Sequence, residues 1–379
     1  MKTRKSVLTI GGAMIDTIAV IDDELIERMS MNNADRAFLL LEEGRKTEAS
    51  IISTHAGGGA INAAVSFARL GFTVTALVKL GKDARARAIR DALQSEGVSQ
   101  DLIVETDAAG TGASVLISAH ERNAAVFTFR GANSLLESSD LPKAGFTQDI
   151  VYITGLSDRS AGLFPSIVNK AATAGAFITA NPGIRQLAGR GGEFQQALAK
   201  ISLLSINHDE AAALLPRLLE RLPKATQRFS TAQPAETEGL MRRGFSASGF
   251  EMSLPHFCES VLALGPHCVI ITDGSRGAYA ATNDEIVFCP ALTVDVVGTA
   301  GAGDAFTSTF TALYANGSTP GVALQYACVN ASSVVGFADT QSGLLRRPAL
   351  DDKMAAVTNR LTVRSWHCDQ KQTKVRQVV

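Results

Sequence analysis

Short apolar runs alternate along the chain with longer segments whose apolar residues recur at helical spacing. The short runs are rich in β-branched residues, and several end in Gly, Asn or Asp, which is typical of buried strands. Strands that alternate with amphipathic segments predict a mostly parallel sheet covered by helices on both faces. The predicted strands are SVLTIGG, TVTALVKLG, DIVYITG, AFITAN, SLLSIN and HCVIITDG. The fold class is therefore α/β, and ligands are expected beyond the carboxyl ends of the strands.

Two regions break this rhythm. TIAVI, near residue 17, and the pair ASVLISA and AAVFTFRG, between residues 113 and 131, alternate apolar with polar positions. This alternation predicts half-buried antiparallel strands joined by turns. We therefore expect them to form a small separate sheet.

Two further segments carry little pattern. The stretch from about residue 216 to 255 is polar, contains several Pro and Gly residues, and predicts an insertion that is partly flexible. The C-terminal end, about residues 362–379, is basic and unpatterned, which predicts a loose tail. No internal repeat is found.

Composition narrows the classes of partner. The chain has 379 residues, 46% of them hydrophobic, and a formal charge of -1, so it has no electrostatic case for binding nucleic acid or an anionic membrane. It has no apolar run of about 18 residues or more to span a bilayer, and we expect a cytoplasmic protein. The five cysteines lie far apart without a CxxC pair, which predicts neither a zinc site nor a disulfide framework.

A first glycine-rich stretch, AGGGAINAAVSFARLG, is expected to open a helix that ends at Gly71. Gly57 and Gly58 offer bare backbone that a ligand can approach closely, and Asn62 projects an amide from the first helical turn. The stretch lacks the third glycine of a dinucleotide-binding fingerprint. The geometry of a tight turn is the alternative explanation.

A second glycine-rich stretch, GTAGAGDAF, precedes a segment with apolar residues at helical spacing. A helix is predicted to begin at Ala302, so that Gly301, Ala302 and Gly303 present unpaired N–H groups without side chains in the way. Such a helix start attracts phosphoryl oxygens. The carboxylate of Asp304 can then take the proton of a hydroxyl held against the phosphate. An acid that merely complements the helix dipole is the alternative.

These stretches carry a resemblance to a known family. GGGAINAA followed by ARLG, GKDARARAIRDALQSEGV and GTAGAGDAF resembles the PfkB (ribokinase-like) family of carbohydrate and nucleoside kinases, from about residue 6 to 345 without the insertion. The resemblance implies one ribokinase-like kinase domain over residues 1–379, with a three-layer α/β/α fold and a mostly parallel central sheet. It also implies a small β-sheet lid, formed from about residues 13–56 and 104–131.

The resemblance implies roles on the acceptor side. Asp16 matches the acid that binds substrate hydroxyls at the end of the first strand, although alone it would pass for a turn acid. Gly57, Gly58 and Asn62 match the substrate-binding turn of the family.

The resemblance also implies roles on the nucleotide side. Asn207 and Glu210 match an N-x-x-E motif, in which the acid helps to hold Mg²⁺ through water; alone the pair would be a helix cap. TDGSRG is similar to the T-x-G-x-x-G nucleotide loop. The residues expected near ATP are Thr272, Gly274, Gly277 and, beside the adenine, Asn330.

Three departures from the family pattern matter. Many relatives carry an acid for a monovalent cation where this chain has Gly298, and the nearest acid, Asp295, lies three residues earlier, so potassium activation is not expected. Ribokinases proper carry a Glu within the stretch that reads TGLSDR here, which argues against ribose. The stretch from Ile26 to Thr54 is similar in length to the adenosine-kinase branch, without a pattern that marks a purine pocket.

The predicted function is an ATP- and Mg²⁺-dependent transfer of the γ-phosphoryl group to a primary hydroxyl of a sugar or sugar-like substrate. Asp304 would act as the base, and closure of the lid would exclude water. The exposed edges of the lid favour a homodimer. A nucleoside kinase of the adenosine or inosine type is the alternative on the same fold. A binding protein without activity is the alternative from another class, against which Asp304 and the N-x-x-E motif count.

Overall fold

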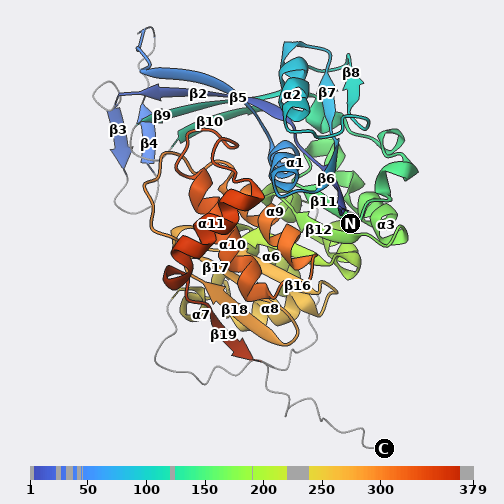
Figure 1. Ribbon diagram of the computed structural model, residues 1–379, viewed down its shortest axis with the longest axis vertical. Helices are drawn as coiled ribbons and strands as arrows, with labels where there is room; N and C mark the ends of the chain where they lie inside the picture. Colours follow the sequence, from blue (N-terminus) through green and yellow to red (C-terminus); the bar gives the residue numbers. More distant parts are fainter. Residues whose placement is uncertain are drawn as a thin grey trace, which may run out of the picture.

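The computed structural model describes residues 4–22, 27–30, 37–40, 44, 46–119, 124–189, 191–219 and 239–367. Within these residues the largest sheet has nine strands, in the order β19-β18-β17-β16-β13-β12-β11-β1-β6 (Figure 1). Their bounds are β1 Ser6–Ile10, β6 Thr73–Leu77, β11 Ile150–Thr154, β12 Phe177–Asn181, β13 Leu203–Asn207, β16 Cys268–Thr272, β17 Ala278–Ala281, β18 Glu285–Cys289 and β19 Arg364–His367.

The sheet is mostly parallel, as the sequence predicts. Strands β6, β1, β11, β12, β13 and β16 run parallel to their neighbours, whereas β17, β18 and β19 extend the sheet in antiparallel fashion. Each of the six runs predicted as strands contributes to this sheet. TVTALVKLG divides into β6 and the short β7 (Lys79–Gly81), which pairs with β8 (Val104–Thr106).

Buried side chains alternate between the two faces of the sheet, as in a strand covered on both sides. In β11, Val151 and Ile153 join one apolar cluster, whereas Ile150 and Tyr152 join another. The first cluster includes side chains of α3 (Phe164–Thr173), α4 (Ile184–Gly189), α5 (Gly191–Ala197), α6 (His208–Leu219), α7 (Leu240–Arg243) and α8 (Leu254–Leu262). The second includes side chains of α1 (Gly59–Arg69), α2 (Ala84–Ser95), α9 (Ala302–Tyr314), α10 (Pro320–Val334) and α11 (Arg347–Val357). The predicted arrangement of helix, sheet and helix is confirmed.

A separate four-stranded sheet, called the lid sheet here, projects from one end of this body (Figure 1). Its order is β10-β9-β2-β5, with bounds β2 Met14–Ile21, β5 Ile51–Gly57, β9 Gly112–Ala119 and β10 Ala124–Phe129. The predicted small sheet is therefore confirmed, although β2 pairs with β9 in parallel. Residues 104–106, which the sequence assigned to the lid, form β8 instead. The strands β3 (Glu27–Ser30) and β4 (Ala37–Leu40) pair in antiparallel fashion and lie between β2 and β5 along the chain.

The segment predicted as an insertion is only partly described, because residues 220–238 lie outside the described residues. After them come α7 and a hairpin of β14 (Phe245–Ala247) and β15 (Phe250–Met252). Phe245 and Met252 are buried in the core, so this end of the segment is packed against the body.

The predicted loose tail is wrong for residues 364–367. They form β19, which pairs with the edge of the main sheet at β18, with Trp366 opposite Ile286. Trp366 packs against the apolar core, so burial of one large aromatic residue accompanies the pairing. Residues 368–379 lie outside the described residues. Among the described helices, none is long and apolar enough to cross a membrane.

Candidate active site

Helix α9 begins as the sequence predicts, at Ala302. Gly301 precedes it with a left-handed φ of 79°, and a Cβ there would stand 2.7 Å from Cβ of Thr340. Glycine therefore fits both the backbone and the space. No side chain caps the helix, and the neighbourhood of Gly303 is open, with no atom within 4 Å of an added Cβ. The N–H of Ala302 donates weakly to the carbonyl of Thr299 (3.4 Å), so fewer donors are free than expected.

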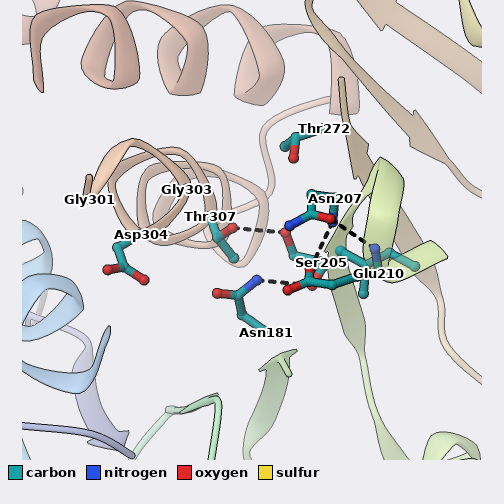
Figure 2. Close-up of a pocket in the computed structure, with 10 residues that line it drawn as sticks. Asn181, Ser205, Asn207, Glu210, Thr272, Gly301, Gly303, Asp304 and Thr307 are labelled. Atoms are coloured by element: carbon teal, nitrogen blue, oxygen red, sulfur yellow. Dashed lines mark hydrogen bonds between the residues drawn. The ribbon is translucent and has the colours of Figure 1, made fainter. Parts of the chain in front are cut away.

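A pocket of about 210 Å³ lies against this helix start and the carboxyl ends of the central strands. A cavity of this size is large enough for several water molecules or for a small polar ligand. Figure 2 shows the lining side chains, with Asp304 on the α9 side and Glu210 across from it. The lining residues are Asn181, Ser205, Ile206, Asn207, Glu210, Thr272, Gly301, Gly303, Asp304 and Thr307.

Asp304 stands on the first turn of α9 and receives one strong hydrogen bond. Nδ2 of Asn62 donates to its Oδ2 at 2.8 Å. Burial raises the pKa of Asp304, the hydrogen bond from Asn62 lowers it, and the charge of Asp16 raises it. A carboxylate held in this way has a pKa above that of a solvated aspartate, which suits a base that must accept a proton.

Helices α1 and α9 lie side by side and are joined by matched polar contacts. Asn62 meets Asp304, and one turn further along both helices Ser308 donates to Ser66 at 2.7 Å. Helix α1 begins after Gly58, whose φ is 95°. Because Asn62 and Asp304 lie on the first turns of the two helices, the two glycine-rich stretches of the sequence meet at Asp304.

Asp16, on β2 of the lid sheet, faces the same region. It is 9% exposed, and its Oδ1 accepts a hydrogen bond from Ser114 on β9. Burial raises the pKa of Asp16, while the hydrogen bond from Ser114 and the charge of His55 lower it. A Cβ on Gly57 would collide with Oδ2 of Asp16, so the bare backbone of this turn lets the carboxylate lie against it.

Asn207 and Glu210 cap the start of α6 reciprocally, because each side chain accepts from the backbone N–H of the other at 2.9 Å. Burial raises the pKa of Glu210 to about 7, the hydrogen bond from Asn207 lowers it, and the charges of Asp209 and Asp304 raise it further. A nearby cation would lower the pKa of this carboxyl group, since a cation favours the ionised form.

Of the residues predicted on the nucleotide side, Asn207, Glu210 and Thr272 line the pocket. Thr272 ends β16 beside it, whereas Gly274 and Gly277 lie in the following turn with φ of 57° and 123°. Asp273, which follows Thr272, has a buried carboxylate that is held by Arg276 and by Arg243 of α7, both at 2.7 Å.

Asn330 lies apart from this group. It is fully buried on α10, donates to Thr309 at 2.8 Å and accepts from the N–H of Leu345 at 2.9 Å. Both ends of its side-chain amide therefore form hydrogen bonds within the protein.

Sequence reasoning missed three polar residues of the pocket: Asn181, Ser205 and Thr307. Asn181 donates to the carbonyl of Ser205 (3.0 Å), and the hydroxyls of Ser205 and Thr307 meet at 2.8 Å (Figure 2). Asn181 ends β12 and Ser205 lies near the end of β13, so the rule that ligands gather at the carboxyl ends of parallel strands would have found two of them.

Comparison with known proteins identifies the family of the chain. The family described as pfkB family carbohydrate kinase matches residues 6–239 and 254–346. The chain belongs to this family. It is therefore a phosphotransferase that acts on sugar hydroxyls. The two matched parts leave out residues 240–253, which include α7 and the β14–β15 hairpin.

Relatives and solved structures agree with the family. The chain is 24% identical to a deoxyribokinase of Salmonella typhi, over 86% of this chain and 94% of the relative. Among solved structures it is similar to Arabidopsis thaliana ribokinase complexed with ribose and ATP, with a TM-score of 0.66 and 19% identity over 93% of this chain and 99% of that one. A putative ribokinase II from E. coli in complex with ATP and Mg²⁺ gives a TM-score of 0.70 and 15% identity over the same shares. These likenesses confirm the ribokinase fold.

Proposed function

We propose that this family member transfers the γ-phosphoryl group of ATP to a primary hydroxyl of a sugar or sugar-like substrate. The observation that carries the proposal is the position of Asp304. It stands at the start of a helix, on the wall of a polar pocket, and close enough to the acid Asp16 for their charges to interact. The pocket would hold the phosphates of ATP, and the acceptor would lie between the pocket and the lid sheet.

The base and the anion hole share one helix turn. The carboxylate of Asp304 would take the proton of the acceptor hydroxyl as the oxygen attacks phosphorus. The N–H groups at the start of α9, around Gly301, Ala302 and Gly303, would stabilise the charge that builds up on the phosphoryl oxygens. The open space at Gly303 supports this role, because phosphate oxygens can approach the backbone there.

The residues of the pocket fit a hydrated Mg²⁺ bound to ATP. The described residues hold no cluster of three or more metal-ligating acids, histidines or cysteines. Mg²⁺ commonly keeps several waters and uses one or two carboxylates together with substrate phosphates. Glu210, with its raised pKa, would accept hydrogen bonds from that hydration shell, and Asn207 keeps the carboxylate in place. Bound there, Mg²⁺ supplies neutralisation of charge on the phosphates.

The acceptor would be bound from the lid side. Asp16 presents a buried carboxylate fixed by Ser114, and a carboxylate accepts two sugar hydroxyls well. The turn of Gly57 and Gly58 would border the acceptor, and the missing side chain at Gly57 lets Asp16 lie against this turn. On the nucleotide side, Thr272 would lie near the phosphates, with Gly274 and Gly277 forming the turn toward the ribose.

Pairing of two lids in a homodimer is supported by an apolar face. Val115 and Phe127 lie opposite each other on β9 and β10, and both are exposed, by 42% and 60%. Alternation along β9 puts Val115 on the face opposite Ser114, hence away from Asp16. Phe127→Lys puts a charge on this apolar face and should convert a dimer to a monomer. Light scattering measures the molecular mass that tests this.

The experiment that tests the proposed function is a panel of sugars and nucleosides with release of ADP as the readout. Asp304→Asn, purified in parallel, is the matched control for a contaminating kinase. ADP release that depends on a sugar and on Asp304 is expected. A preference for nucleosides would favour the nucleoside-kinase alternative, and absence of ADP release with every acceptor would favour a binding protein.

A further inference from the structure

The side-chain amide of Asn62 is occupied at both ends. Its Nδ2 donates to Oδ2 of Asp304 at 2.8 Å, and its Oδ1 accepts from Oγ1 of Thr340 at 2.9 Å and from Nε2 of Gln341 at 3.2 Å. Asn62 and Thr340 are 3% and 7% exposed. Nε2 of Gln341 can only donate, and it also donates to the carbonyl of Ala56 at 2.8 Å, so Oδ1 of Asn62 must face it and Nδ2 must face the carboxylate.

The loop that supplies these donors is held rigidly. The carboxylate of Asp339 accepts from the N–H groups of Gln341 and Ser342 at 2.8 and 2.7 Å. The guanidinium of Arg69, at the end of α1, donates to the carbonyls of Gln341 and Leu344, both at 2.7 Å. The loop is therefore preorganised before any ligand binds.

Thr340 also lies between the two glycine turns. A Cβ on Gly301 would stand 2.7 Å from Cβ of Thr340, and a Cβ on Gly57 would stand 3.5 Å from its hydroxyl. The same side chain thus contacts the turn before α9 and the turn on the acceptor side.

We infer that Thr340 and Gln341 are positioning residues for the base. They orient the amide of Asn62, so that Asn62 holds Oδ2 of Asp304 and leaves Oδ1 to take the proton. Among the described residues, no donor other than Asn62 binds the carboxylate of Asp304. This inference rests on the proposed function, in which Asp304 is the base.

The orientation of the amide matters because Asp304 lies in a region of negative charge. The titratable groups that face it are Asp16 on β2, Glu210 on α6 and Tyr152 on β11. With Nδ2 toward it, Asn62 stabilises the carboxylate. With the amide turned over, its oxygen would face the carboxylate and repel it.

Kinetics of Thr340 variants test the inference. Thr340→Val keeps the shape but removes the donor to Asn62, and we expect kcat to fall about 10- to 100-fold, the scale of a misplaced reacting group. KM for ATP should stay within about twofold and the acid limb of the pH profile should move to higher pH. Thr340→Ser, which keeps the hydroxyl, should restore both. If Thr340→Val does not fold, Gln341→Met removes the other donor and takes its place.

A matched control separates position from stability. Thr179 is fully buried on β12 and its hydroxyl meets that of Thr311 at 3.3 Å, so Thr179→Val also removes one buried hydroxyl. It should leave kcat and the pH profile unchanged. Wild-type kinetics in Thr340→Val, or a loss that Thr340→Ser does not restore, would overturn the inference.

A second readout does not require turnover. The ¹³C resonance of the Asp304 carboxyl carbon, assigned by its absence in Asp304→Asn, should titrate at higher pH in Thr340→Val than in the wild type. This shift in a protein without kinase activity would support the positioning and reject the proposed function. An unshifted titration in an active enzyme would reject the positioning alone.

Discussion

Two helix starts meet in this site, and they use glycine for different reasons. Before α1, a Cβ on Gly58 would stand 2.6 Å from the carbonyl oxygen of Gly12, and a Cβ on Gly59 would stand 3.0 Å from Thr154. At the start of α9, Gly301 is equally crowded, but Gly303, the second residue of the helix, has no neighbour within 4 Å of an added Cβ. The glycines of α1 therefore let protein pack on protein, whereas Gly303 leaves space for a ligand.

A glycine-rich stretch alone therefore does not identify a phosphate site. Both helices lack a side-chain cap and both follow a glycine with positive φ. Helix α9 starts at the wall of the pocket and carries an acid in its first turn, Asp304, whereas the first turn of α1 carries none. We therefore expect the catalytic base on α9 and the acceptor beside the start of α1.

The largest expected effect is that of Asp304→Asn on turnover. The amide keeps the size of the carboxylate but cannot accept the proton, and positioned base catalysis is worth about 10²- to 10⁴-fold. We expect kcat to fall by at least about 100-fold while the thermal midpoint changes little. If Asp304 only complemented the helix dipole, the variant would lose about 0.3 to 1 kcal/mol of stability and keep nearly normal turnover.

Asp16→Ala sharpens the comparison from the acceptor side. Loss of a charged acceptor should cost about 1.5 to 3 kcal/mol for each sugar hydroxyl, or about 10- to 100-fold in KM for the acceptor. KM for ATP should change far less, because Asp16 does not line the phosphate pocket. Initial rates with each substrate varied in turn measure this, and an equal rise in both values would remove Asp16 from the acceptor site.

A pair of alanine substitutions tests the two uses of glycine directly. Gly58→Ala places a side chain at a φ of 95° against Gly12, so it should lower the free energy of unfolding by about 1 to 3 kcal/mol. Gly303→Ala should raise it by about 0.4 to 1 kcal/mol, yet reduce turnover, because the methyl group enters the phosphate space. Denaturant unfolding and ATP kinetics on both proteins measure this. Equal loss of stability in the two variants would contradict the comparison.

The pH profile is expected to show the electrostatic coupling of the two sides. Asp304 must be ionised to act as a base, and its pKa is raised, so kcat/KM should fall on the acid side at higher pH than for a solvated aspartate. Because the charge of Asp16 raises that pKa, Asp16→Asn should move the acid limb to lower pH. A limb that stays in place would show that the two carboxylates are not coupled.

The smallest expected effect is that of potassium. By the resemblance, Gly298 stands where many relatives carry a cation-binding acid, and the nearest acid before it in the sequence, Asp295, is exposed. Activity should therefore change less than about twofold between potassium and a large-cation control. A many-fold stimulation would show that backbone carbonyls near Gly298, such as that of Phe337 at 3.0 Å from an added Cβ, suffice for a cation.

Much of this fold and part of the site could be predicted from the sequence. The strands, the starts of α1 and α9, and the small lid sheet follow from local patterns of apolar residues and glycine. The contacts of Asn62 with Thr340 and Gln341 could not be predicted, because they join positions 278 and 279 residues apart. The hydrogen bonds of Asn330, which the resemblance placed beside the adenine, with Thr309 and with the N–H of Leu345 could not be predicted either.

The most direct test of the central claim is the single-turnover rate of phosphoryl transfer, with enzyme in excess over ATP and the acceptor saturating. This measurement isolates chemistry from product release, which can limit kcat. In Asp304→Asn, we predict ATP binding within about twofold of the wild type and a transfer rate at least about 100-fold lower. A transfer rate close to that of the wild type, with ATP equally bound, would contradict the assignment of Asp304 as the base.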